Sequence, residues 1–130
     1  MRPRLWRFLL PSQATAASEA FLEDAGRRQF FAPPIFPWEV AHVLLRRFTN
    51  EPQRAQHGFN HLMALPVNAV AAADPTQPAS LMGLAALHRL TLFDAAYLDL
   101  ALALDAPLAT RDAALISAAS QAGAAAIDLR

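Results

Sequence analysis

The sequence predicts an α/β fold with a parallel sheet, and three observations support this. Stretches with the apolar spacing of helices alternate with short apolar runs of strand length. Hydrophobic residues make up 55% of the chain and charged residues 17%, a balance typical of a globular domain. A length of 130 residues suits one domain with a core of its own.

The first third of the chain is the least regular. Residues 1–11 are basic and aromatic, and a short strand, a helical turn and an extended arm are all compatible with them. Residues 12–25 carry an apolar stripe, which predicts a helix that ends at Gly26. Residues 29–32 are a strand candidate, because two prolines follow them directly.

The middle of the chain predicts three helices and one strand. Helices are expected over residues 37–50, 52–64 and 78–89, and a strand over residues 66–71. His57 and His61 stand four residues apart in the second helix, a spacing that two metal ligands can use. No acid or third histidine supports them, so we interpret both as surface side chains.

Residues 91–112 are the most informative stretch. Thr91 with Asp94 three residues later is a capping signature for a helix that reaches to about residue 105. This helix is apolar nearly all round, which predicts that it is buried. Residues 107–110 form a short apolar run, which predicts a buried strand, and Asp112 opens an alanine-rich helix. A helix stop and a last strand are expected over residues 123–129.

Three acids stand at the starts of predicted helices: Glu39, Asp94 and Asp112. In a parallel sheet the strands point the same way, so helix starts gather at the carboxyl edge, where ligands bind. These acids are therefore candidates for one shared site. The alternative is that each acid only caps its helix or favours the helix dipole, which is the more common role of a single acid there.

The amino-acid sequences of these segments resemble those of the PIN-domain family, and most closely those of the toxin ribonucleases of VapBC-type toxin–antitoxin pairs. The resemblance covers residues 9–129 and rests on P-x-x-x-x-E-V-A-H-V-L-L, L-T-L-F-D-A-A-Y-L-D-L-A, P-L-A-T-R-D-A-A-L and A-A-I-D-L. It implies a single PIN-like domain over residues 1–130, with three α/β/α layers and a short, mostly parallel central sheet.

The resemblance also implies a function. It implies a magnesium-dependent endoribonuclease, with Mn²⁺ as the other usable ion, that acts as the toxin of a toxin–antitoxin pair. Its partners would be RNA, a cognate antitoxin protein and a second copy in a homodimer. The matching catalytic and metal-binding positions are Glu39, Asp94 and Asp112. Thr110 and Arg111 precede Asp112 at the same edge and are expected to bind substrate.

One part of the family pattern has no match. The family opens with a hydrophobic strand that ends in an aspartate and is followed by a helix. Here residues 5–11 look like the tail of that helix, and no acid precedes them. We therefore expect residues 1–10 to be atypical or truncated, without the family's first acid and central strand. The alternative function is a degenerate PIN fold that binds an antitoxin or another partner without cutting RNA. An unrelated α/β domain with ordinary helix caps is a third interpretation.

The amino-acid composition narrows the classes of protein to which the chain can belong. The chain has no cysteine, which excludes disulfides and thiol chemistry within it. No apolar run approaches the ~20 residues of a membrane span, so a cytoplasmic protein is expected. The net charge is zero and all eleven basic residues are arginine, so any attraction for nucleic acid must be local.

Overall fold

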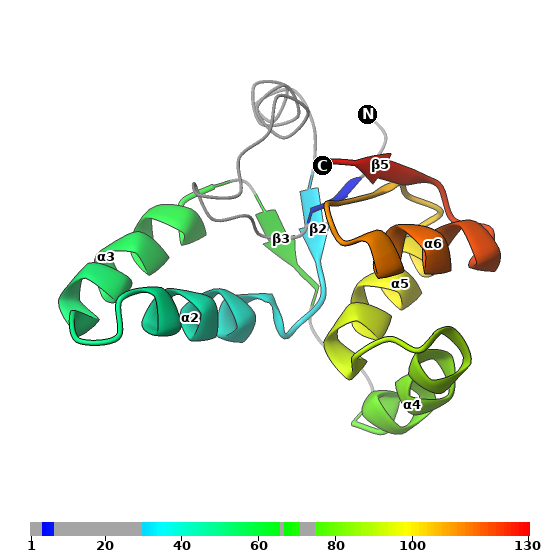
Figure 1. The fold of residues 1–130 in the computed structure, drawn as a ribbon, viewed down its shortest axis with the longest axis horizontal. Coiled ribbons are helices and arrows are strands. Elements are labelled where there is room, and N and C mark those ends of the chain that lie inside the picture. The colour runs from blue at the N-terminus through cyan, green and yellow to red at the C-terminus, as the bar shows by residue number, and fades with distance from the viewer. Residues whose placement is uncertain (1–3, 7–29, 66, 71–74) are drawn as a thin grey trace.

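A parallel sheet of five short strands organises the protein (Figure 1). The computed structural model describes residues 4–6, 30–65, 67–70 and 75–130. The strands are β1 (Arg4–Trp6), β2 (Phe30–Ala32), β3 (Val67–Ala69), β4 (Leu108–Thr110) and β5 (Ala126–Asp128). The described helices are α2 (Phe36–Arg47), α3 (Pro52–Met63), α4 (Gln77–His88), α5 (Leu92–Leu104) and α6 (Ala113–Ala122).

The strand order is β3-β2-β1-β4-β5, and every neighbouring pair is parallel. The chain therefore moves from β1 to β2 and β3 in one direction, then returns to β4 on the other side of β1 and ends at β5. Strand order reverses between β1 and β4. In open α/β sheets this reversal marks the crevice at the carboxyl ends of the strands where ligands bind.

The central strand is present, which corrects the sequence-based expectation for the start of the chain. Leu5 of β1 pairs with Phe31 of β2 on one side and with Leu108 of β4 on the other. Residues 4–6 are thus a strand and not the tail of a helix. A three-residue strand carries almost no local signal, because its stability comes from neighbours that are distant in sequence. The helix expected over residues 12–25 lies outside the described residues.

The other predicted elements are confirmed to within a few residues, and their ends show why. Pro52 occupies the first turn of α3, where its missing N–H costs nothing. Thr91 caps α5, since its hydroxyl accepts a hydrogen bond from the Asp94 amide at 3.1 Å. Gly123 ends α6 with φ of 84°, the left-handed conformation that glycine adopts without strain.

Helix α5 supplies the centre of the core. Residues 94–98 are all buried, and Tyr97 and Leu98 have no exposed surface. This helix packs against α4, α6 and the strands β1 and β4. The prediction that it is buried all round is wrong at its first turn and along one stripe, because Phe93 is 54% exposed and Leu102 is 38% exposed. Periodicity shows that a face is apolar but not which neighbour covers it.

The direction of α5 places its start at the carboxyl edge of the sheet. Only three residues separate the end of the helix at Leu104 from the start of β4 at the amino edge. At 1.5 Å per residue its 13 residues span about 20 Å, which exceeds the length of a three-residue strand. The first turn of α5 therefore lies towards the edge where β2 and β4 end and where α2 and α6 begin.

Among the residues that the structure describes, no helix is both long and apolar enough to span a membrane.

Removing a core side chain of α5 tests this packing. Leu98 is fully buried, so Leu98→Ala should lower the free energy of unfolding by about 2–5 kcal/mol. Leu87→Ala is the matched control, because Leu87 on α4 is 75% exposed, and it should change stability by no more than about 0.5 kcal/mol. Urea denaturation followed by circular dichroism measures both, and equal losses would contradict the assigned core.

Candidate functional site

A hydrogen bond between two helices defines the candidate site. The hydroxyl of Tyr97 donates to Oε1 of Glu39 at 3.0 Å, across 58 residues of sequence. Glu39 lies in the first turn of α2, and Tyr97 lies in the first half of α5. Tyr97 is fully buried, so its hydroxyl needs a partner inside the protein. Glu39 supplies that partner, and the bond fixes the start of α2 against α5.

Asp94 lies three residues before Tyr97, on the same face of α5. Its side chain is only 6% exposed, in a helix where its neighbours are apolar. A buried carboxylate is costly unless other groups compensate its charge. Its position in the first turn of a helix is favourable, because the helix dipole stabilises negative charge there. The hydroxyl that caps this helix belongs to Thr91, so capping by Asp94 does not explain the buried acid.

Asp112 caps α6, as the alternative interpretation expected. Its Oδ1 accepts a hydrogen bond from the Leu115 amide at 3.0 Å. The Asp112 amide in turn donates to the hydroxyl of Thr110 at 3.1 Å. A carboxylate has two oxygens with several lone pairs, so a cap made by one oxygen is compatible with a metal contact made by the other.

Thr110 and Arg111 connect β4 to this cap. Thr110 is 1% exposed, and its hydroxyl accepts from the Asp112 amide, so its contact in this structure is with the site acid. Arg111 is half-buried between Thr110 and Asp112. Their positions follow from β4, whose last residue is Thr110 and which lies next to the central strand.

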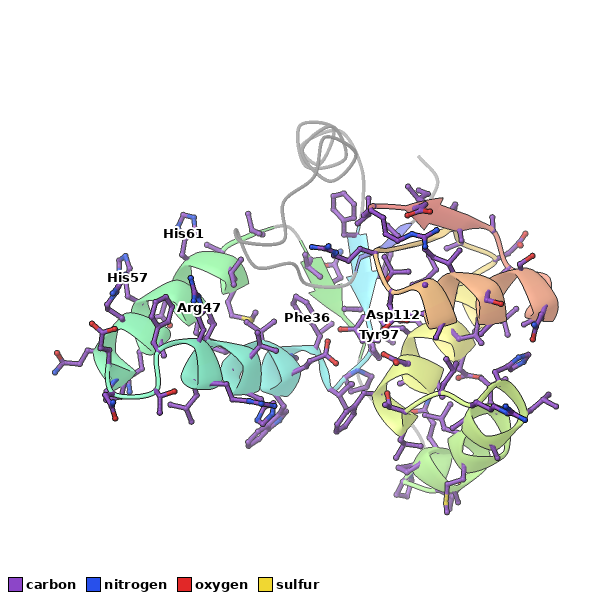
Figure 2. The ribbon with its side chains drawn as sticks, in the orientation of Figure 1. Phe36, Arg47, His57, His61, Tyr97 and Asp112 are labelled. Carbon is purple, nitrogen blue, oxygen red and sulfur yellow. The ribbon has the colours of Figure 1, made fainter. Side chains whose placement is uncertain are left out.

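The structure links the candidate acids in part. Glu39 is joined to α5 through Tyr97, one turn from Asp94, while Asp112 begins α6 after the neighbouring strand (Figure 2). No group of three or more His, Cys, Asp or Glu side chains in the described ranges is arranged to hold a metal ion. Convergence of all three acids on one ion therefore stays a prediction. Their chemistry suits Mg²⁺, which prefers oxygen ligands and commonly uses only one or two carboxylates together with water and phosphate.

The family's first acid has no counterpart although its strand is present. Strand β1 ends at Trp6 and is followed in sequence by Arg7, and residues 1–18 contain no acid. Relative to the family pattern, the chain therefore keeps the central strand but has no acid directly after it in sequence.

Two polar residues at this part of the molecule were missed by the sequence-based analysis. Tyr97 belongs to the F-D-A-A-Y motif, and its spacing of three from Asp94 was the available signal. Asp128 ends β5 in register with Thr110, at the carboxyl edge of the sheet. Its hydrogen bonds with Arg130, the shortest of 2.7 Å, lower the pKa of Asp128 to about 2. Asp128 is therefore ionised at neutral pH, with its charge matched by Arg130.

His57 and His61 are confirmed as surface side chains. Both are exposed on α3, in the helical hairpin that extends away from Asp112 and Tyr97 (Figure 2).

Comparison with known proteins relates this chain to a known family. The model of the PIN domain matches residues 5–121, from β1 into α6. The crystal structure of PAE2754 from Pyrobaculum aerophilum is similar, with a TM-score of 0.69 and 16% sequence identity, over 97% of this chain and 90% of that one. At that identity the likeness shows the fold alone, the three-layer α/β/α arrangement. A search of curated proteins finds no match.

The family model matches most of the chain, and the parallel sheet with its reversal of strand order beside β1 is consistent with that match. The chain belongs to the PIN domain family.

Proposed function

We propose that the protein is a metal-dependent endoribonuclease and the toxin of a toxin–antitoxin pair. PIN domains are generally nucleases that act on RNA and use divalent metal ions. The observation that carries the proposal is the Tyr97–Glu39 hydrogen bond, because it brings Glu39 to the helix that buries Asp94. Both acids stand in first turns of helices, and α/β folds bind their ligands at the carboxyl edge of the sheet.

The proposed metal ligands are Glu39, Asp94 and Asp112, acting directly or through water. Mg²⁺, or Mn²⁺ in its place, would neutralise the charge that develops on the scissile phosphate. Arg111 is proposed to contact a phosphate, because its guanidinium offers paired donors that match phosphate oxygens. Thr110 is proposed to act on substrate only through Asp112, whose amide it holds.

Tyr97 is proposed as a positioning residue. Its hydroxyl donates to Oε1 of Glu39, which restricts the rotamer of that side chain and so limits where its carboxylate can meet a metal or a bound water. Preorganised ligands bind a metal more tightly than mobile ones, because less conformational entropy is lost on binding.

The missing first acid sets the expected level of activity. A site with one carboxylate fewer should bind Mg²⁺ more weakly, and each 1.4 kcal/mol lost lowers the affinity about tenfold. We therefore expect slow cleavage that requires a high metal concentration.

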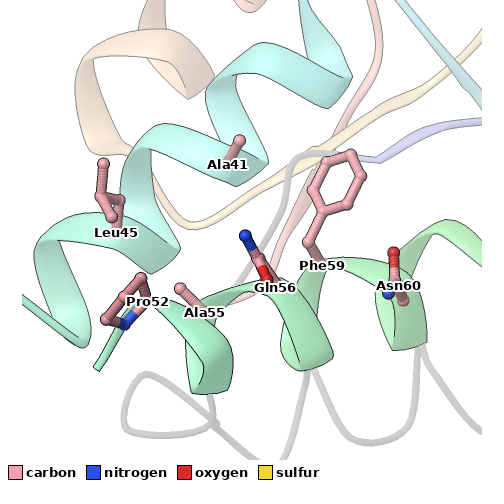
Figure 3. A pocket seen from close by; sticks show the side chains of 7 residues that line it. All are labelled: Ala41, Leu45, Pro52, Ala55, Gln56, Phe59 and Asn60. Carbon is pink, nitrogen blue, oxygen red and sulfur yellow. The ribbon is translucent and has the colours of Figure 1, made fainter.

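The second candidate function is a PIN fold that binds a partner without cutting RNA, and the same missing acid favours it. A groove between α2 and α3, with a volume of about 400 Å³, offers a largely apolar surface for such a partner (Figure 3). It is lined by Ala41, Leu45, Pro52, Ala55, Gln56, Phe59 and Asn60. An antitoxin segment that places an aliphatic side chain there is compatible with both functions, as is the homodimer that the resemblance implies. Only the nuclease cuts RNA.

Cleavage of an RNA pool with and without chelator tests the nuclease. Activity should require Mg²⁺ or Mn²⁺ and vanish in Asp94→Asn and Asp112→Asn. Asparagine caps helices about as well as aspartate, so Asp112→Asn should remove the proposed ligand charge while preserving the cap. Asp99→Asn is the control on α5 and should stay active. Cleavage that survives chelator or Asp94→Asn would refute the assigned site, and a stable protein that never cuts would favour the second function.

Tyr97→Phe tests the positioning role. The ring is retained and one hydrogen bond to a carboxylate is lost, so the free energy of unfolding should fall by about 1–3 kcal/mol. The metal concentration that gives half-maximal cleavage should rise, with a smaller change in the maximal rate. In a Glu39→Ala background, which removes the acceptor, the same substitution should cost less stability, which a double-mutant cycle measures. Strict additivity of the two losses would show that the bond does not couple the helices.

A further inference from the structure

Two exposed aromatic side chains stand beside the candidate site. Trp38 is 80% exposed and Phe93 is 54% exposed, and no other Phe, Tyr or Trp whose side chain the structure describes is exposed. Trp38 immediately precedes Glu39 in α2, and Phe93 immediately precedes Asp94 in α5. Side chains of this size gain free energy when they are covered, so aromatic rings left in solvent at a site indicate a surface that a ligand covers.

The interhelical hydrogen bond brings these two aromatic positions to the same region. Phe93 lies four residues before Tyr97 and so on the same face of α5, about 6 Å nearer the start of the helix. The hydroxyl of Tyr97 contacts Glu39, the neighbour of Trp38 in the first turn of α2. The face of α5 that carries Phe93 is therefore the one directed at the first turn of α2.

The local charge near the two rings favours a negatively charged ligand. Residues 40–64, which follow Trp38 through the hairpin of α2 and α3, contain three arginines and one glutamate, although the whole chain has net charge zero. His42 and Arg46 continue the exposed side of α2 from Trp38 at helical spacing, and both are exposed. In a nucleic acid the bases can stack on the aromatic rings, and the phosphates can contact the basic surface that follows the rings. Bases inside a duplex are stacked on each other, so only an unpaired strand can present them to the rings.

We propose that Trp38 and Phe93 form a stacking platform that binds unpaired bases of the RNA next to the scissile phosphate. This proposal rests on the proposed function in that it takes RNA as the substrate. The platform selects unpaired RNA without reading a particular sequence, because every base has a stacking face. It also provides binding energy that does not depend on the carboxylates, which by themselves repel phosphate.

Binding of fluorescently labelled RNA, measured by anisotropy, tests the platform. The parent is Asp94→Asn with Mg²⁺ present, so that the RNA stays intact, and the probes are an unstructured 12-nucleotide RNA and a 12-base-pair RNA duplex. Trp38→Ala and Phe93→Ala should each weaken binding of the single strand about 5- to 150-fold, the contribution of one stacked base. Trp38→Phe should retain most of the affinity. Leu87→Ala, which removes an equally exposed side chain from α4, should leave it unchanged.

The two proposals fail in different ways. Single-strand binding that is equal in the parent, Trp38→Ala and Phe93→Ala, or equal affinity for single strand and duplex, would overturn the platform while leaving the nuclease intact. A wild-type chain that never cuts RNA but binds it through Trp38 would overturn the nuclease and retain the platform. Light scattering on the same variants measures their oligomeric state, which tests whether a second protein chain covers the rings instead of RNA. A dimer that dissociates in Trp38→Ala without any loss of RNA affinity would assign the rings to a protein interface and overturn the platform.

Discussion

The hydrogen bond from Tyr97 to Glu39 is the contact on which the rest of the site depends. A fully buried phenol needs an acceptor, and here the acceptor comes from a helix 58 residues earlier in the chain. Satisfying one polar atom therefore also sets the position of α2 relative to α5. Asp94 and Phe93 follow from the register of α5, and Trp38 follows from that of α2. The same contact thereby relates Glu39 and Trp38 on α2 to Asp94 and Phe93 on α5.

Strand β1 shows that fold and chemistry are separable in this chain. The sheet requires only that residues 4–6 pair on both sides, and they pair with β2 and β4. Metal affinity requires carboxylates, and the strand is followed by Arg7 where the family pattern has an acid. Backbone pairing is indifferent to that change, because it involves main-chain groups alone. The family match can therefore extend through β1 although no acid follows this strand in sequence.

Local signals in the sequence were sufficient for most elements. Pro52, Thr91 and Gly123 mark helix ends through backbone geometry or a nearby hydrogen bond, and they predict those ends correctly. Strand β1 and the partner of Tyr97 were missed, because both depend on contacts between segments far apart in sequence. The exposure of Phe93 was missed for a similar reason, since an apolar pattern does not show which faces other elements cover. The three acids were selected through the family resemblance, and their common approach to one ion is a prediction.

A crystal of the protein grown with Mn²⁺ and measured at the manganese absorption edge tests the central claim most directly. Anomalous scattering locates the ion without reference to catalytic activity. We expect a peak about 2.1 Å from a carboxylate oxygen of Asp94, the distance typical of a small divalent ion, with Glu39 and Asp112 in its direct or water-mediated shell. Manganese bound only at His57 and His61, or no bound manganese at saturating concentration, would contradict a metal site built on α2, α5 and α6.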